Sequence, residues 1–114
     1  SFDPQKLPGV WHASDKTANV TWIFSPDGGF RYQVQYQNGW IGKLGSNFDI
    51  GGRWKLDDKR LTIELSETPP MVEFWGGNWK GQSTSLQIRR LTNEELSFSN
   101  SELKFRRSLV PAGK

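Results

Sequence analysis

Residues 24–36 read Phe-Ser-Pro-Asp-Gly-Gly-Phe-Arg-Tyr-Gln-Val-Gln-Tyr, and they combine a tight reversal with the clearest alternation in the chain. The proline fixes φ and the glycines accept a positive φ, so we expect the chain to reverse at 25–29. Apolar side chains then recur at every second position from Phe30 to Tyr36, which is the period of a strand with one buried face. This stretch therefore predicts a turn followed by an amphipathic strand.

The same two-residue period continues through most of the chain. It predicts strands over these ranges: 20–24, 50–56, 61–65, 86–89, 96–98 and 103–105. The residues between them carry turn chemistry, and Asn38-Gly39 is the preferred pair for a tight hairpin. Gly51-Gly52 lies inside a predicted strand, which indicates a bulge or a sharp bend of the kind that a small barrel needs.

A chain of about eight short strands joined by tight turns is typical of an antiparallel meander. A meander leaves two exposed edges unless it closes on itself, so we expect an all-β, up-and-down barrel rather than an open sheet. The length of 114 residues suits one domain, and we predict that residues 1–114 form it. Seven Phe, six Trp and two Tyr supply apolar area for a core. No apolar run is long enough to predict a transmembrane helix.

The side chains that carry most enzyme chemistry are scarce. The chain has no cysteine, which excludes disulfides, thiol catalysis and zinc sites built on sulfur. His12 is the only histidine, and we interpret it as a surface or hydrogen-bonded group rather than as a base or a metal ligand. Nothing resembles a serine nucleophile elbow, a phosphate loop or a calcium loop. We therefore predict a protein that is not an enzyme and that uses neither a metal nor a cofactor.

The charge balance is basic, with 15 Lys and Arg against 12 Asp and Glu, a net charge of +3 and an isoelectric point near 9.4. The main basic clusters are Arg89-Arg90 and the group Lys104, Arg106 and Arg107. Basic grooves with aromatic side chains bind single-stranded nucleic acid in some barrels. The net charge is modest, however, and Lys and Arg are expected on the solvent faces of alternating strands. We therefore expect no nucleic-acid binding.

Several short motifs follow one another from about residue 7 to residue 107. They are Leu7-Pro8-Gly9-Val10-Trp11, Phe24-Ser25-Pro26-Asp27-Gly28, Gly52-Arg53-Trp54-Lys55-Leu56-Asp57 with Leu61-Thr62-Ile63, and a closing pattern of Leu86-Gln87-Ile88-Arg89-Arg90-Leu91-Thr92, Leu96 and Phe105-Arg106-Arg107. In type and order they resemble the motifs of the small bacterial branch of the lipocalin-like domains. The resemblance implies an up-and-down barrel of about eight strands, whose width leaves room for side chains or one small ligand.

The resemblance also carries expectations about location. Many members of the family are exported or lipid-anchored proteins of the bacterial envelope, so the resemblance implies a periplasmic or envelope-associated protein. Met71 is the only methionine, so Ser1 is not expected to be a translation start. Because the chain has no cysteine, a residue that carries a lipid anchor would have to precede Ser1.

Aromatic side chains are the candidate ligand contacts. The set is Tyr32, Tyr36, Trp40, Phe74, Trp75 and Trp79. We expect Tyr32 and Tyr36 inside the barrel and Trp40 near one of its ends. Within 71–80, Val72 and Phe74 can face inward, which leaves Trp75 at a rim and places a flexible loop tip between Trp75 and Trp79. In the structural alternative, one of these tryptophans caps the barrel and the other packs on its own hairpin.

The remaining tryptophans are interpreted as core. Trp11 and Trp54 each end a Gly-x-Trp unit, where the glycine allows close approach of the backbone, and we expect both to pack at the closed end of the barrel. Trp22 shares a strand face with Val20 and Phe24, which indicates an inward position.

Two functions remain open from the sequence. The leading hypothesis is a binding protein that takes up a small apolar or amphipathic ligand, as the larger lipocalins do at the barrel mouth. The alternative is a protein-interaction module, such as an inhibitor, an immunity protein or an assembly accessory protein. In that alternative Trp75 and Trp79 anchor the partner, and the arginines at 89, 90, 106 and 107 steer an acidic one.

Overall fold

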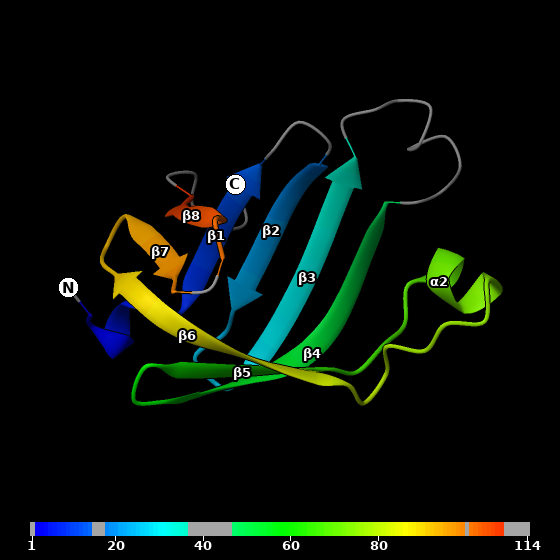
Figure 1. The fold of residues 1–114 in the computed structure, drawn as a ribbon, viewed down its shortest axis with the longest axis horizontal. Coiled ribbons are helices and arrows are strands. Elements are labelled where there is room, and N and C mark those ends of the chain that lie inside the picture. Colours follow the sequence, from blue (N-terminus) through cyan, green and yellow to red (C-terminus); the bar gives the residue numbers. More distant parts are fainter. Residues whose placement is uncertain (1, 15–17, 37–46, 100, 109–114) are drawn as a thin grey trace.

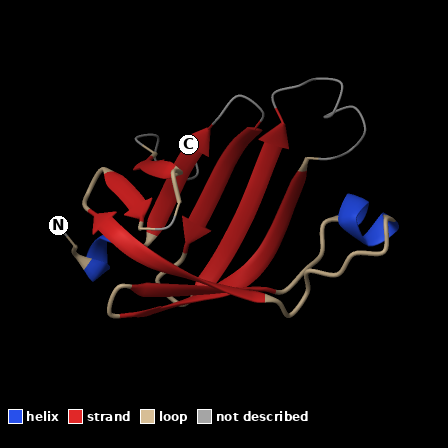
Figure 2. Ribbon diagram, in the orientation of Figure 1, coloured by secondary structure: helices blue, strands red, loops and turns tan. Residues whose placement is uncertain are grey.

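The computed structural model describes residues 2–14, 18–36, 47–99 and 101–108 (Figure 1). The strands are β1 (Gly9–Ser14), β2 (Ala18–Phe24), β3 (Gly29–Tyr36), β4 (Phe48–Asp57), β5 (Arg60–Leu65), β6 (Ser83–Leu91), β7 (Glu95–Phe98) and β8 (Lys104–Arg107). A 3-10 helix, η1 (Pro4–Lys6), precedes them, and a short α-helix, α2 (Pro70–Phe74), lies between β5 and β6 (Figure 2).

The strands close into a barrel. Each strand pairs antiparallel with the next one, and β8 returns to pair with β1. The two-residue period sets the two faces of the wall: in β3, Phe30 and Val34 are buried while Arg31 and Gln35 are exposed. The predicted all-β, up-and-down barrel is therefore confirmed, and Phe30 of β3 is buried inside it.

Strand β4 bends at the glycine pair that the sequence singled out. Residues 48–53 pair with β3 and residues 52–57 pair with β5, so Gly52 lies where β4 passes from one neighbour to the other. A Cβ at Gly52 would collide with the carbonyl oxygen of Glu64, which explains the absence of a side chain there. The pairing keeps its register, so a bend rather than a bulge is observed, and Figure 1 shows the resulting curvature.

One end of the barrel is sealed by η1 and the residues that follow it. Leu7 and Trp11 have no exposed surface, and Trp11 Nε1 donates a hydrogen bond of 2.8 Å to the Leu7 carbonyl oxygen. Trp54 Nε1 donates to the carbonyl oxygen of Ser25 at the same distance. The prediction that Trp11 and Trp54 pack at a closed end is confirmed.

Arg107 completes this closed end. Its guanidinium carbon lies 4.3 Å from the centroid of the Trp11 ring. Its Nε donates to the carbonyl oxygen of Asn93 at 2.8 Å, and its Nη1 and Nη2 donate to the carbonyl oxygens of Pro8 and Lys6. Each of its three nitrogens thus bonds to a backbone carbonyl oxygen within the chain, and the role of Arg107 in steering an acidic partner stays a prediction.

The segment that contains Phe74 is helical rather than extended. Residues 70–74 form α2, which begins with a proline and lies at the tip of the β5–β6 connection, outside the strands (Figure 2). A helix does not place alternate residues on one face, so Phe74 is 76% exposed and its predicted inward orientation is wrong. Among the described residues, no helix has the length and hydrophobicity that a bilayer crossing requires.

The contacts of Arg107 generate a test of barrel closure. Replacing Arg107 by Met removes three donors and leaves their carbonyl partners unpaired, so we expect the free energy of unfolding to fall by about 2–4 kcal/mol. The adjacent Arg106 is exposed on the same strand, and Arg106→Met is the matched control, with an expected change within about 0.5 kcal/mol. Urea unfolding followed by circular dichroism measures both, and equal losses in the two variants would contradict the assignment.

Candidate functional site

A cavity of about 230 Å³ lies inside the barrel, beyond the sealed end. Its lining consists of Trp22, Phe30, Tyr32, Ile63, Leu65, Thr84, Leu86, Phe98, Ser101, Leu103 and Phe105. All of these side chains except Thr84 and Ser101 are hydrophobic or aromatic. The lining comes from six strands and from the loop between β7 and β8, so the cavity belongs to the barrel as a whole.

Strand pairing explains why these side chains converge. Trp22 of β2 lies opposite Tyr32 of β3, and both occupy inward positions of the two-residue period. Phe105 of β8 closes the circle, because its ring stacks on Trp22 with 4.4 Å between centroids and 25° between planes. The centre of the barrel is thus an aromatic cluster with free volume beside it.

The cavity meets solvent where the barrel wall is incomplete. β7 pairs only with residues 88–91 of β6, so among the described residues 83–86 have a neighbouring strand on the β5 side alone. Two lining residues of this region, Thr84 and Leu103, are exposed, and Leu103 is 38% exposed although it is a leucine. The shortness of β7 therefore produces an opening between the first half of β6 and the β7–β8 loop.

The interior around the cavity disfavours charge. Within the part of the chain that the structure describes, no charged side chain lines it. Trp22 Nε1 is buried and has no hydrogen-bond partner there. Burial raises the pKa of Tyr32 above its ordinary value, and the nearby Tyr36 raises it further. These features describe a low-dielectric interior that disfavours charge.

Of the ligand contacts predicted from the sequence, Tyr32 lines the cavity. Tyr36 lies four residues further along β3 and is half-buried, and its backbone N–H donates to Asn47 Oδ1 at 2.9 Å. Trp79 is half-buried and reaches the cavity wall only through Phe48. Its ring contacts Phe48 edge-to-face at 5.7 Å, and Phe48 contacts Tyr32 in the same way at 5.1 Å.

Phe74 and Trp75 lie outside the cavity. Each is 76% exposed, and their rings form an edge-to-face pair at 5.3 Å on the protruding end of α2. Trp40, the remaining predicted contact, lies outside the described residues, as does the Asn38-Gly39 pair. The structure thus brings Tyr32 and Trp79 into one chain of ring contacts and leaves the Phe74–Trp75 pair apart.

Several lining residues were not among the predicted contacts, although most carried a signal. Trp22 was interpreted as core, and Phe30 and Phe105 lie in strands that the alternation predicts. Alternation identifies which side chains face inward, but it does not distinguish packed positions from positions beside a void. That distinction depends on the length of β7, which the sequence does not state.

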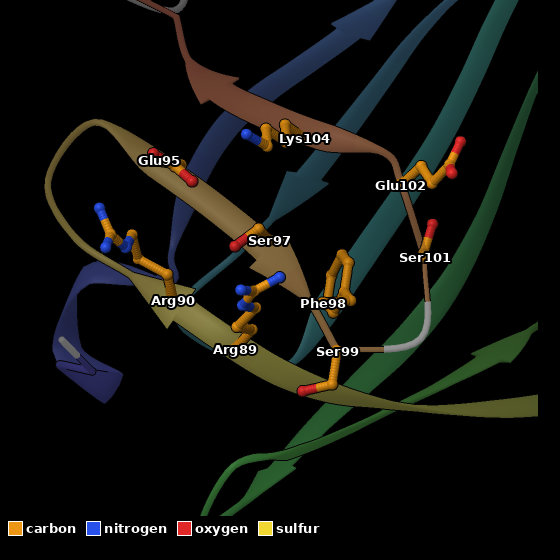
Figure 3. Close-up of a pocket in the computed structure, with 9 residues that line it drawn as sticks. All are labelled: Arg89, Arg90, Glu95, Ser97, Phe98, Ser99, Ser101, Glu102 and Lys104. Carbon is orange, nitrogen blue, oxygen red and sulfur yellow. The ribbon is translucent and has the colours of Figure 1, made fainter.

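A second concave surface lies on the outer face of β6, β7 and β8 and measures about 640 Å³. A register shift between Ile88 and Arg90 turns both Arg89 and Arg90 to solvent, and Lys104 joins them from β8 (Figure 3). In the described ranges the only ion pair joins Arg31 and Asp49 at 2.7 Å, so none of these three cations is paired. Glu95 and Glu102 line the same surface, and we call the three cations Arg89, Arg90 and Lys104 the basic groove (Figure 3).

Comparisons with solved structures agree with this architecture. A lipocalin-like protein from Bacteroides uniformis superposes with a TM-score of 0.60 at 18% identity, covering 90% of this chain and 99% of that one. The fold is lipocalin-like. An uncharacterized protein from Bacteroides eggerthii has the same arrangement, with a TM-score of 0.55 at 17% identity over 89% of this chain and 98% of that one. The sequence matches no protein-family model and no curated protein.

The lipocalin-like barrel offers no assembled metal site in the residues described, because no three His, Cys, Asp or Glu side chains gather there. His12 lies on the outer face, where its Nδ1 is 3.0 Å from Thr21 Oγ1. The interpretation of His12 as an exposed, hydrogen-bonded group is thereby confirmed. The candidate site of this barrel is therefore the apolar cavity.

The raised pKa of Tyr32 predicts an alkaline signature. A raised pKa means that the folded barrel holds the phenolic proton more tightly than the unfolded chain does, so this contribution is complete below pH about 10 and is lost as the pH rises through the folded pKa. Urea unfolding between pH 8 and 11 should show a steeper loss of stability in the wild type than in Tyr32→Phe. Tyr36→Phe should retain most of the steep loss, because burial is the larger cause; a wild-type profile no steeper than that of Tyr32→Phe would contradict the assignment.

Proposed function

We propose that this lipocalin-like barrel is a non-enzymatic binding protein that takes up one small, uncharged, apolar molecule in its cavity. The observation that carries the proposal is the unfilled apolar volume of about 230 Å³ beside Trp22. Protein interiors are normally packed as densely as organic crystals, so a hollow of this size forgoes stabilising contacts. The closed end of the same barrel is filled, with Leu7, Trp11 and Leu91 fully buried.

The volume of the cavity limits the size of the ligand. It exceeds the ~150 Å³ of an engineered apolar cavity that binds benzene. It is smaller than the ~300–1,000 Å³ that is typical of sites for drug-sized molecules. A molecule with one ring or a short branched chain fits this range, whereas an extended fatty acid does not fit entirely inside.

The affinity would come from apolar burial against the aromatic cluster, and the opening beside Thr84 and Leu103 would admit the ligand. Binding removes the apolar surface of both ligand and cavity from water, which contributes roughly 25 cal/mol for each Å² buried. Because no charged side chain among the described residues lines the cavity, a charged ligand group would lose its hydration without gaining an ionic partner.

A substitution that fills part of the cavity tests this proposal. Leu86 lines the cavity and is half-buried, so Leu86→Trp should occupy part of the volume and weaken binding of toluene by about tenfold or more. The Phe74→Ala/Trp75→Ala double variant is the control and should bind toluene as the wild type does, because both side chains lie outside the cavity. Binding is measured by titration calorimetry or by a change in tryptophan emission, and absence of binding by toluene, ethylbenzene and cyclohexanone to the wild type would overturn the proposal.

A second candidate function is docking of a protein partner on the aromatic pair Phe74–Trp75. Two large rings that are each 76% exposed on a protruding helix resemble the anchors that dominate protein interfaces. Strands β7 and β8, which form part of the basic groove, lie on the opposite side of the barrel from α2 (Figure 1). One small partner would therefore use the aromatic pair as its anchor, and the groove would act at most through long-range attraction.

The partner hypothesis predicts a selective loss. The Phe74→Ala/Trp75→Ala double variant should lose a partner captured by the wild-type chain, with little effect on stability, because these rings contact mainly each other. Trp79→Ala is the comparison variant, since Trp79 packs against Phe48 and supports the barrel rather than the exposed pair. Retention of the partner by the double variant in quantitative pull-downs would contradict docking at α2.

We also propose, from the motif resemblance, that the protein acts in the bacterial envelope. The support is the order of the motifs between residues 7 and 107, together with the lipocalin-like fold. Fractionation of cells that express the full-length gene, followed by detection of the protein in periplasmic, membrane and cytoplasmic fractions, tests the location. Recovery in the cytoplasmic fraction alone would overturn it.

A further inference from the structure

The outer face of β7 carries a buried serine. Among the described residues, Ser97 is the only polar residue that is buried, with 7% of its surface exposed. It faces the concave surface of the basic groove, because its neighbours Leu96 and Phe98 belong to the core of the barrel. Its hydroxyl makes no hydrogen bond within the described residues, and that oxygen is not among the buried atoms closed to solvent. The hydroxyl is therefore available to a ligand in the groove.

Strand pairing places Ser97 between two cations. Arg90 of β6 is the register partner of Ser97, and Ser97 is the register partner of Lys104 of β8. Register partners project from the same face of a sheet, so the three side chains form one row across three strands. Neighbouring strands lie about 4.8 Å apart, which separates the backbones of the two cations by roughly 10 Å. The shortest side chain of the row lies between the two longest, so the row forms a notch with Ser97 at its floor.

The register shift in β6 adds a third cation to this notch. One extra residue lies between Ile88 and Arg90, so Arg89 and Arg90 are both exposed on the groove (Figure 3). Bulges of this kind re-aim side chains, and they are frequent beside functional sites. Among the described residues, no carboxylate forms an ion pair with Arg89, Arg90 or Lys104. Like charges that gather without a counterion repel one another, and a bound anion would relieve this repulsion.

Two carboxylates restrict the kind of anion that fits. Glu95 and Glu102 line the same concave surface. Glu95 is the register partner of Arg106, which offsets its charge, whereas Glu102 lies further from Ser97 along the groove (Figure 3). A long polyanion that follows the groove would meet both carboxylates. A compact anion above Ser97 would instead meet the cations of the notch, so the arrangement favours a single anionic group.

We propose that the notch formed by Arg89, Arg90, Ser97 and Lys104 binds one phosphoryl group, carried by a small soluble phosphate ester or by a lipid headgroup. A guanidinium group donates paired hydrogen bonds to two phosphate oxygens, an ammonium group supplies a point charge, and a hydroxyl donates to a further oxygen. A tetrahedral oxyanion accepts from several sides at once, whereas the two oxygens of a carboxylate lie in one plane with its carbon. This site lies on the outer face of the wall, so it is independent of the apolar cavity.

Titration of the ¹⁵N-labelled protein with glycerol 3-phosphate at low ionic strength tests the inference. Saturable shifts should concentrate at the amides of the notch, and acetate should bind at least about tenfold more weakly. Arg90→Gln should weaken binding by about tenfold, and Ser97→Ala by about threefold or more, because each removes a charge-assisted hydrogen bond. Arg60→Gln is the matched control, since Arg60 is equally exposed but lies outside the groove, and it should bind as the wild type does.

Ser97→Ala separates a built site from diffuse attraction, because it leaves every charge in place. Wild-type affinity in Ser97→Ala, or equal losses in Arg90→Gln and Arg60→Gln, would overturn the site. Sedimentation with vesicles that contain phosphatidic acid distinguishes the two sources of the phosphoryl group. Vesicle binding that is lost in Arg90→Gln, without binding of glycerol 3-phosphate, supports the site and identifies a lipid headgroup. Failure of the wild type to bind either probe overturns the proposal.

The cavity supplies an independent readout. Arg90→Gln should bind toluene as the wild type does, because Arg90 does not line the cavity. Loss of toluene binding in Arg90→Gln would show that the substitution disturbs the barrel, and it would overturn the independence of the two sites. Failure of the wild type to bind toluene bears on the proposed function alone and leaves the phosphoryl site standing.

Discussion

The contact between Arg107 and the closed end is the constraint on which the barrel depends. β8 has four residues and pairs with β1 at two positions, Trp11↔Arg107 and His12↔Arg106, which is a short ladder for closing a cylinder. The Arg107 guanidinium extends this ladder by binding three carbonyl oxygens and covering the Trp11 ring. These acceptors belong to the N-terminal segment and to the β6–β7 turn, so one side chain joins the first and last parts of the wall. Every inward position has its neighbours only because this seal holds.

The cavity is a consequence of unequal strand lengths around that seal. β4 and β6 have ten and nine residues, whereas β7 and β8 have four each. Near Arg107 all strands are present, and the inward side chains fill the interior. Further along, β7 and β8 end while β6 continues, so the wall lacks a segment and the side chains that would come from it. The hollow beside Trp22 and the opening beside Thr84 therefore have the same geometric cause.

The sequence predicted those features that depend on a period and missed those that depend on contacts. Alternation identified every strand except β1, the barrel and the inward position of Tyr32, because a strand buries every second residue whatever its neighbours are. The same period places Arg107 on the inward face with Phe105. Its charge nevertheless led to the prediction of a surface role, because the sequence does not show the carbonyl oxygens to which its guanidinium donates. In α2, Val72 and Phe74 satisfied alternation, while Pro70 after Pro69 was a signal for a helix start that the pattern did not weigh. The unpaired nitrogen of Trp22 has no counterpart in any sequence pattern, since hydrogen-bond satisfaction exists only in three dimensions.

Folding and binding make opposite demands on position 22. A phenylalanine there would satisfy the aromatic cluster around Phe105 without burying an unpaired N–H group, and a larger aliphatic residue elsewhere on the lining would reduce the void. Either change favours the empty barrel. The observed residue instead buries a donor that has no partner among the described residues, and it lies beside an unfilled volume, whereas Trp11 at the closed end donates to the Leu7 carbonyl oxygen. Local conflicts of this kind concentrate at functional sites, because selection for stability alone removes them. The location of the conflict, inside the barrel rather than at the exposed rings of α2, is the reason to place the primary function in the cavity.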